Sequence, residues 1–282
     1  MAAVLALVSA ICYGVSDFSG GVASRRSPAI AIVLVSNTLS LLLGLLAVAL
    51  LPGSTYRSSD VLWGLAAGAV GLLGVVLLYR GLAIGPMSVV APLTAVLSAV
   101  VPVVVGAARG ERPGALAVGG IALAIPAMVL IGRESRAATG PPIGRPALVS
   151  ALAAGFSFGG FYVLLAQTGS DGGAWPLVGQ RAASVAILLV LTAVSLLRGI
   201  PGLPQGRTLG LAAVAGVTDF LANLAYVLAT HRGLLALVAV LSSLYPATTV
   251  LLARGILGER LARQQVGGLA LAGAAVSLIA AG

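Results

Sequence analysis

The segment ALVSAICYGVS at residues 6–16 returns as ALVSALAAGFS at residues 147–157, with seven of eleven positions identical. Shorter repeats follow in the same order: AVLS at 95–98 and 239–242, Gly-Glu-Arg at 110–112 and 258–260, and GGIALA at 119–124, which returns as GGLALA at 267–272. Self-similarity of this kind indicates a duplicated structural unit. We therefore predict a first repeat at 1–138 and a second repeat at 139–282.

The composition predicts that both repeats lie in a membrane. Hydrophobic residues make up 59% of the chain, charged residues only 8%, and the mean hydropathy is +1.12. Soluble domains carry about 25% charged residues. Too few charges are present to cover a water-soluble surface, and a single cysteine excludes a disulfide scaffold. The outer surface is expected to face the lipid bilayer.

Ten apolar runs approach the roughly 20 residues that a helix needs to cross a bilayer. They lie at about 3–23, 28–51, 61–80, 87–108, 114–132, 146–167, 174–197, 209–229, 233–254 and 265–281. Each run is predicted to be a helix, because a backbone in lipid must satisfy its own hydrogen bonds. The predicted fold is an all-α integral membrane protein with ten transmembrane helices, five in each repeat.

Five is an odd number of spans, so the second repeat is expected to enter the membrane upside down relative to the first. Two inverted repeats around a central cavity are the usual architecture of secondary transporters. A structural pseudo-symmetry without transport is the alternative.

All sixteen basic residues are arginines. Without lysine, the chain has neither a Gly-Lys-Ser/Thr phosphate-binding loop nor Schiff-base chemistry. A net charge of +9 would suggest nucleic acid for a soluble protein, but here the arginines lie between apolar runs, where they set membrane orientation. The sequence shows neither a metal-ligand cluster nor a nucleophile–base pair, so we expect no cofactor, metal, nucleic-acid partner or enzymatic activity.

The run LSSLYPATTVLLARGILGERLARQQVGGLALAGAAVSL at 241–278 resembles the closing segment of EamA-type proteins in the drug/metabolite transporter superfamily. The resemblance implies ten helices, with the first four of each half around a central cavity and the fifth and tenth at the periphery. Composition agrees, since the run 115–132 has no polar side chain and the run 266–281 has only Ser277.

Two indicators of orientation disagree. Odd-numbered connections carry eleven arginines and even-numbered ones four. By the positive-inside rule, this count predicts odd connections in the cytoplasm and both termini outside. The family resemblance implies both termini inside. In either orientation, the expected location is the inner (plasma) membrane, as a multi-pass protein.

Three ionisable residues lie clearly inside apolar runs: Asp17, Arg181 and Asp219. Each costs about 2.5–3.5 kcal/mol on insertion scales, so each is a functional candidate. At a rise of about 1.5 Å per residue, Asp219 lies about 7 Å in depth from Arg181, and Asp17 about 13 Å. We therefore predict that Arg181 neighbours Asp219 and that Asp17 lacks a fixed cation.

A buried carboxylate without a cation disfavours its charged form, so Asp17 is a candidate carrier of a coupling proton. Alternatively, Asp17 bonds to backbone or to a hydroxyl near its helix end. For Arg181 and Asp219, a structural ion pair and a substrate clamp remain open.

Further candidates surround these groups. Asn223 and Tyr226 continue the helical stripe of Asp219, and Tyr13 precedes Asp17 by one turn. Pro102 and Pro246 free the carbonyls of Ser98 and Ser242, which suits a cavity wall or hinge but also bland kinks. Tyr245 lies beside Pro246 in the ninth run and belongs to the same candidate wall. The weaker candidates are Asn37 and Gln180, as cavity residues or as interhelical contacts. Glu111, Glu259 and His231 are expected to be turn, helix-start or solvated residues.

These observations predict a secondary transporter of small metabolites, with proton-coupled export of amino-acid-like solutes as the first reading. An arginine and carboxylates in one cavity suit a zwitterion. Efflux of lipophilic or cationic drugs is the alternative, which an unpaired Asp17 favours and a free Arg181 opposes. A non-transporting membrane sensor is a third reading. The expected partners are a small-molecule substrate, protons and lipid, with the chain as a monomer or homodimer.

Overall fold

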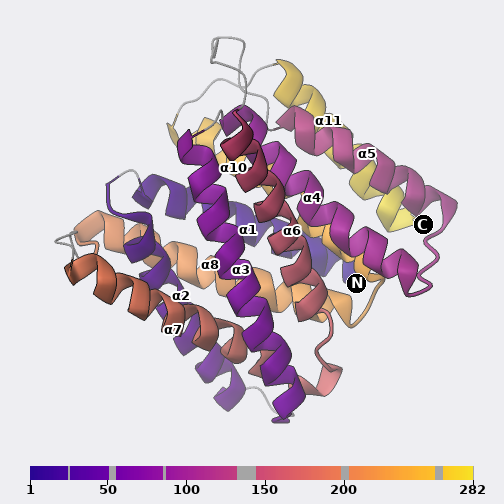
Figure 1. The fold of residues 1–282 in the computed structure, drawn as a ribbon. Coiled ribbons are helices and arrows are strands. Elements are labelled where there is room, and N and C mark those ends of the chain that lie inside the picture. Colours follow the sequence, from indigo (N-terminus) through magenta and orange to yellow (C-terminus); the bar gives the residue numbers. More distant parts are fainter. Residues whose placement is uncertain are drawn as a thin grey trace.

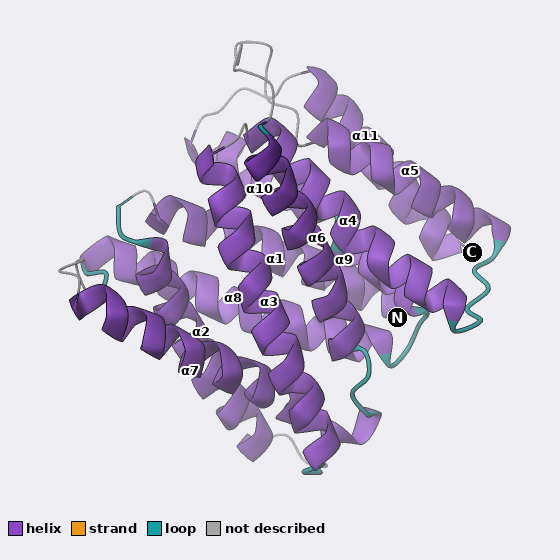
Figure 2. Ribbon diagram, in the orientation of Figure 1, coloured by secondary structure: helices purple, strands orange, loops and turns teal. Residues whose placement is uncertain are grey.

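The computed structural model describes residues 1–24, 26–50, 55–84, 87–131, 144–197, 203–257 and 263–281, all of whose regular structure is helical (Figures 1 and 2). The helices of the first half are α1 (Ala2–Ser24), α2 (Ala29–Leu50), α3 (Ser58–Ile84), α4 (Met87–Ala108) and α5 (Ala115–Ile131). Those of the second half are α6 (Arg145–Leu165), the short η1 (Ser170–Gly172), α7 (Trp175–Leu197), α8 (Gly206–Thr230), α9 (Leu235–Ser242), α10 (Tyr245–Leu257) and α11 (Arg263–Ala281). The predicted repeat boundary at 138–139 lies outside the described residues.

Within the described residues, six helices are long and apolar enough to cross a membrane. They belong to α1, α2, α3, α6, α7 and α8. The other four predicted runs also form helices, namely α4, α5, α11 and the pair α9–α10. The all-helical membrane fold is therefore confirmed, whereas a count of ten spans stays a prediction.

The ninth run is broken into two helices. α9 ends at Ser242 and α10 begins at Tyr245. Pro246, in the first turn of α10, has no N–H to donate to the Ser242 carbonyl, and its ring would clash with that carbonyl in a continuous helix. The break is thus the stronger form of the predicted kink.

The helices of the two halves interleave. α1 packs mainly against α8, and α3 packs against both α6 and α7 (Figure 1). In the repeat, α1 corresponds to α6, α2 to α7 and α3 to α8. The contact between α1 and α8 therefore corresponds to that between α6 and α3, and the contact between α2 and α8 to that between α7 and α3. All four contacts are present. The packing therefore follows the internal two-fold repeat that the sequence predicts.

The repeat is visible in single hydrogen bonds. Ser40 Oγ of α2 donates to Gly216 O of α8 at 2.6 Å, and Ser184 Oγ of α7 donates to Gly68 O of α3 at 3.1 Å. These bonds are equivalent, because α2 corresponds to α7 and α3 to α8. Both glycines are needed at these crossings: an added Cβ would lie 2.5 Å from Ser36 O at Gly216 and 2.0 Å from Gln180 O at Gly68. Small residues let the helix backbones approach closely.

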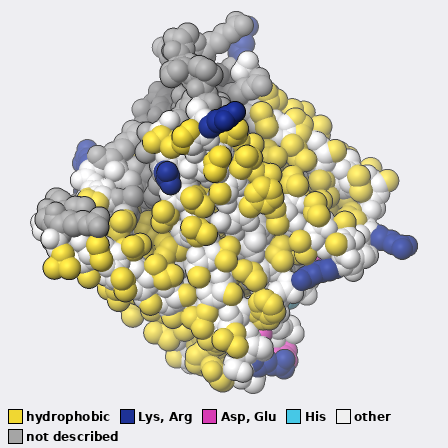
Figure 3. Space-filling model, in the orientation of Figure 1, with side chains coloured by type: hydrophobic (Ala, Val, Ile, Leu, Met, Phe, Trp, Pro, Cys, Tyr) yellow, Lys and Arg dark blue, Asp and Glu magenta, His cyan; other side chains and the backbone are white. Residues whose placement is uncertain are grey.

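α5 and α11 pack mainly against each other at one side of the molecule, as Figure 1 shows. A Cβ at Gly120 of α5 would lie 2.9 Å from Ala275 O of α11. The expected peripheral position of these two helices is confirmed. The outer face seen in Figure 3 is largely hydrophobic, with few basic side chains, as lipid contact requires.

The bundle has two ends that differ in their contacts. One end, here called the termini end, holds both chain termini and the connections 55–57, 109–114, 166–174 and 231–234. The N and C marks lie near each other in Figure 1. Gly233 lies against Ala2, and Met1 and Ile279 line one hollow there. The opposite end, here called the distal end, holds the described connections 26–28 and 203–205.

Candidate substrate site

An ion pair between α7 and α8 lies at the centre of the candidate site. Arg181 Nη2 contacts Asp219 Oδ2, and their side chains are 8% and 23% exposed. Arg181 Nη1 donates to Asn37 Oδ1 of α2 at 2.7 Å. The prediction that Arg181 reaches Asp219 is confirmed, and the guanidinium is buried with both terminal nitrogens engaged. Ser40 Oγ lies 3.4 Å from Asp219 Oδ2.

Asn223 extends this pair into a polar network. Its Nδ2 donates to Asp219 O at 2.7 Å, one turn earlier in α8. Its Oδ1 accepts hydrogen bonds from Tyr13 Oη at 3.0 Å and from Gln180 Nε2 at 3.2 Å. The six residues of this network come from α1, α2, α7 and α8: Tyr13, Asn37, Gln180, Arg181, Asp219 and Asn223. All six were candidate site residues from the sequence alone.

The network breaks the two-fold symmetry of the backbone. Ser40 corresponds to Ser184, so Asn37 and Arg181, three positions earlier, also correspond. Gly68 corresponds to Gly216, so Gly71 and Asp219, three positions later, correspond as well. The bond between Arg181 and Asn37 therefore joins two equivalent positions, but the charges lie only in the second half. Exchanging the conformations of the halves would not reproduce the same chemistry at this point.

Asp17 lies on α1, one turn beyond Tyr13 toward the distal end. Its side chain is exposed, and it makes no hydrogen bond or ion pair with any residue that the structure describes. It interacts electrostatically with Asp219 of α8 and Tyr245 of α10. These neighbours place it on the inward side of α1, between helices of the second half. The prediction that Asp17 lacks a fixed cation holds for the described residues.

Four tyrosines, including Tyr13 of the network, lie together, and two of them, Tyr162 and Tyr226, lie toward the termini end. The Tyr13 ring contacts Tyr162 and Tyr245, with centroids 6.2 and 6.4 Å apart. Tyr226 stacks on Tyr162 at 4.7 Å, and its Oη donates to Tyr162 O at 3.1 Å. Tyr162 of α6 was not predicted from the sequence, whereas Tyr226 was, because Tyr226 continues the helical stripe of Asp219.

The serine and proline candidates lie at helix crossings away from the ion pair. Ser98 Oγ donates to Ala95 O at 2.8 Å within α4 and lies 3.4 Å from Ser243 Oγ. Ser242 Oγ donates to Ala6 O of α1 at 3.4 Å. Pro102 is part of the continuous helix α4, whereas Pro246 follows the break between α9 and α10. The two prolines are thus equivalent in sequence but not in structure.

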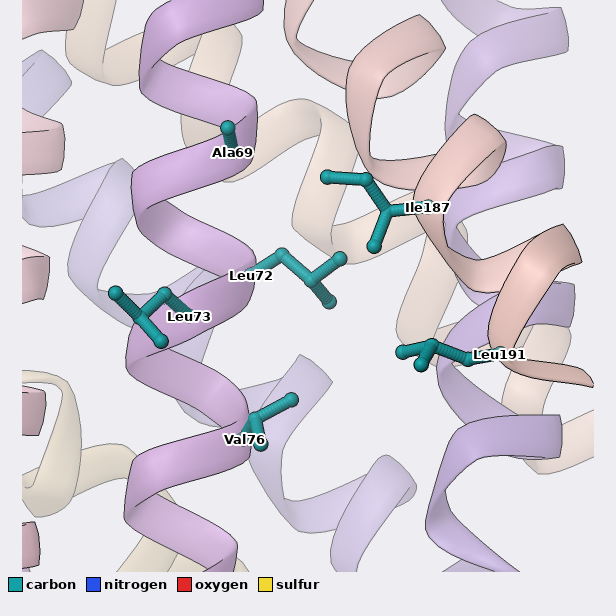
Figure 4. Close-up of a pocket in the computed structure, with 6 residues that line it drawn as sticks. All are labelled: Ala69, Leu72, Leu73, Val76, Ile187 and Leu191. Carbon is teal, nitrogen blue, oxygen red and sulfur yellow. The ribbon is translucent and has the colours of Figure 1, made fainter. Parts of the chain in front are cut away.

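The clearest hollows of the described residues do not coincide with the network. One is an apolar groove between α3 and α7, which Figure 4 shows, lined by Ala69, Leu72, Leu73, Val76, Ile187 and Leu191. Its purely aliphatic walls suit a lipid tail. The other lies at the termini end beside Arg232 and Leu237. Where the central cavity was expected, the polar side chains of the described residues bond to one another. The side chain of Asp17 is exposed.

The described residues contain no group of three or more His, Cys, Asp or Glu side chains that could hold a metal ion. The fold defines an all-helical, multi-pass membrane protein with a buried polar network at the crossing of its two halves. The chain belongs to the EamA-like transporter family, whose model matches residues 1–133 and 145–281.

No curated protein matches the chain. A crystal structure of a protein with 17% sequence identity has the same fold, with a TM-score of 0.76 over 98% of this chain and 95% of that chain.

Proposed function

We propose that the protein is a secondary active transporter that exports small amine-bearing metabolites, amino-acid-like solutes first among them, across the plasma membrane in exchange for protons. The observation that carries the proposal is the contrast between two carboxylates. Asp219 is neutralised by a buried arginine, whereas Asp17 is exposed and has no partner among the described residues. Membership of a transporter family supports the general class.

Asp17 supplies the coupling. A carboxylate that reaches water inside a membrane protein can bind a proton or the ammonium group of a solute. The two ligands compete for one group, so each binding free energy depends on the other. If the protein changes conformation only when Asp17 holds a proton or a solute, one proton is exchanged for one solute in each cycle.

The ion pair supports the amino-acid-like solute. A solute carboxylate can replace that of Asp219 on Arg181, because both are planar two-oxygen acceptors for a guanidinium. The solute ammonium would then bind to Asp17, which already lies within electrostatic range of Asp219. One zwitterion would thus bridge the two charged groups.

The engagement of Arg181 by protein groups favours lipophilic cations as a second candidate class of substrate. Arg181 is buried and engaged by Asp219 and Asn37, so it offers no unoccupied donor to a substrate carboxylate. Tyr13 and Tyr245, near Asp17, present aromatic faces that attract cations. A solute with an amine and no carboxylate needs only these groups.

Purified protein in liposomes with an imposed pH gradient tests the proposal, with amino acids and cationic dyes as solutes. We expect a solute flux driven by the gradient, reduced at least tenfold in Asp17→Asn and unchanged in Cys12→Ala on the same helix. Replacing Arg181 by Gln separates the candidates, since it should abolish amino-acid flux and spare dye flux. A gradient-driven flux that persists in Asp17→Asn would contradict the coupling role.

A further inference from the structure

The connection 166–174, between α6 and α7, is bonded to the beginning of α3. Asp171 Oδ2 pairs with Arg57 Nη2 at 2.7 Å, and Asp171 O accepts the Thr55 N–H at 2.9 Å. Asp60, in the first turn of α3, accepts the Gly169 N–H at 3.0 Å. These three bonds hold a connection of the second half against the connection 55–57 and the first turn of α3, both in the first half.

The same connection is bonded to two more connections at the termini end. Arg109 Nη2 donates to Gln167 Oε1 at 2.9 Å. His231 Nε2 lies 2.8 Å from Thr168 O and is the donor, because a carbonyl oxygen can only accept. The connection 166–174 is therefore the common partner of all the other described connections at this end.

Glu111 fixes a neighbouring element. Its two carboxylate oxygens accept the N–H groups of Leu235 at 2.8 Å and Ala236 at 3.1 Å. Glu111 is thus a helix-start residue as expected, but for α9 in the other half, where a negative charge also complements the helix dipole. The equivalent Glu259 lies outside the described residues.

The path beneath these connections is filled. Tyr226 and Tyr162 are buried and stacked between the polar network and the termini end. Toward the distal end, Asp17 is exposed. Among the described residues, the path from the termini end to the network is therefore closed, whereas Asp17 keeps an exposed side chain on the distal side.

We propose that the connection 166–174 is a latch that closes the termini end, and that its release from Arg57 and Asp60 opens this end while the distal end closes. This inference rests on the proposed transport function, which requires access from both sides in turn. It assigns the moving contact to named residues outside the ion-pair network.

The latch has two kinds of contact: an exposed ion pair, which can open easily, and a close packing contact at Asp60, which sets where the connection closes. Arg57 and Asp171 are 50% and 59% exposed, and exposed ion pairs add little stability. Asp60 is buried, and its Oδ2 has no partner among the described residues. Gly172 lies directly over that oxygen, since an added Cβ would approach it to 2.3 Å. Only glycine lets the connection close on Asp60.

Reporter cysteines in a Cys12→Ala background test the latch without any solute. Ser98→Cys reports on the buried α4–α9 crossing, and Asp17→Cys reports on the distal side. A membrane-impermeant maleimide is applied to each side of membrane vesicles, after a terminal tag has shown which side holds the termini. The latch is released by Gly172→Ala or, with less risk to folding, by Asp171→Asn at the exposed pair.

We expect Gly172→Ala to raise the labelling rate of Ser98→Cys from the termini side at least tenfold. Asp171→Asn should raise it by a smaller factor, because the pair that it breaks is exposed. Both variants should lower the labelling rate of Asp17→Cys from the distal side. Arg112→Gln, exposed at the same end and outside the latch, should change neither rate. Unchanged labelling of Ser98→Cys in both release variants would overturn the latch. Faster labelling of both reporters would overturn it too, since it would indicate local fraying. Because labelling needs no transported solute, failure of the proposed function would leave this result readable.

Discussion

The half of the bundle near the termini end and the half near the distal end are built from the same helices but are packed differently. Near the termini end, α9 is buried on nearly every side, and the second part of α8 is largely buried. Near the distal end, α1 exposes Asp17 and Gly21, and α8 exposes Leu209 and Val214. An inverted repeat gives both ends equivalent helices. Among the described residues, the termini end is therefore the more closely packed of the two, and only one of the two equivalent sets of helices is closed in this conformation.

The largest expected effect tests the packing of the closed half. Tyr226→Ala should lower the free energy of unfolding by about 3–5 kcal/mol, because it leaves a cavity against Tyr162. Phe156→Ala removes an aromatic ring that is 58% exposed, where lipid or detergent fills the space, and should cost less than about 0.5 kcal/mol. Thermal unfolding in detergent compares them. Equal losses would show that Tyr226 is not packed against Tyr162 as the structure has it.

A pair of glycines sharpens the comparison. A Cβ at Gly159 of α6 would lie 2.5 Å from the Val101 Cβ, whereas a Cβ at Gly21 meets nothing within 4 Å. Valine is stiff and cannot turn away, so Gly159→Ala should destabilise by about 1–3 kcal/mol. Gly21→Ala should leave stability unchanged or raise it, since alanine favours helix by about 1 kcal/mol. Denaturation midpoints measure both changes, and a loss of stability in Gly21→Ala would refute the open packing of α1.

A smaller effect is expected at the termini end itself. Glu111→Gln removes the charge and one of two acceptors at the beginning of α9, which should cost about 1 kcal/mol. Hydrogen exchange at the amides of Leu235 and Ala236 should become faster. Arg112→Gln, the exposed neighbour, is the control. Unchanged exchange in Glu111→Gln would show that the cap does not hold α9.

The smallest effect on stability is expected at Asp17, although its effect on transport should be the largest. Its carboxylate is exposed and has no partner among the described residues, so Asp17→Asn should change the free energy of unfolding by less than about 0.5 kcal/mol. A calorimetric scan of the purified protein measures it. A large loss would indicate a structural role for Asp17 and would weaken the contrast between the two ends.

Much of the candidate site was predictable because it depends on depth and helical period. Arg181 and Asp219 lie at compatible depths on neighbouring spans, and they pair. The stripe of Asp219 and Asn223 also enters one network. Tyr226 continues that stripe but joins the tyrosines instead, because α8 at that level faces α6. Tyr162 was missed because its partners lie on α1 and α8, and only the packing of the halves brings these helices together.

The sequence alone determined that the chain lies in a membrane, that it is duplicated and that one arginine pairs with one of the two aspartates inside its apolar runs. Hydropathy, repeat spacing and helical rise are local quantities, so they can be evaluated without knowledge of the fold. Only the tertiary structure decided which end is closed, because the same repeats are compatible with either end being closed. It also decided that the connection 166–174 is the common partner at that end, since its contacts with Arg57, Asp60, Arg109 and His231 join segments far apart in the chain.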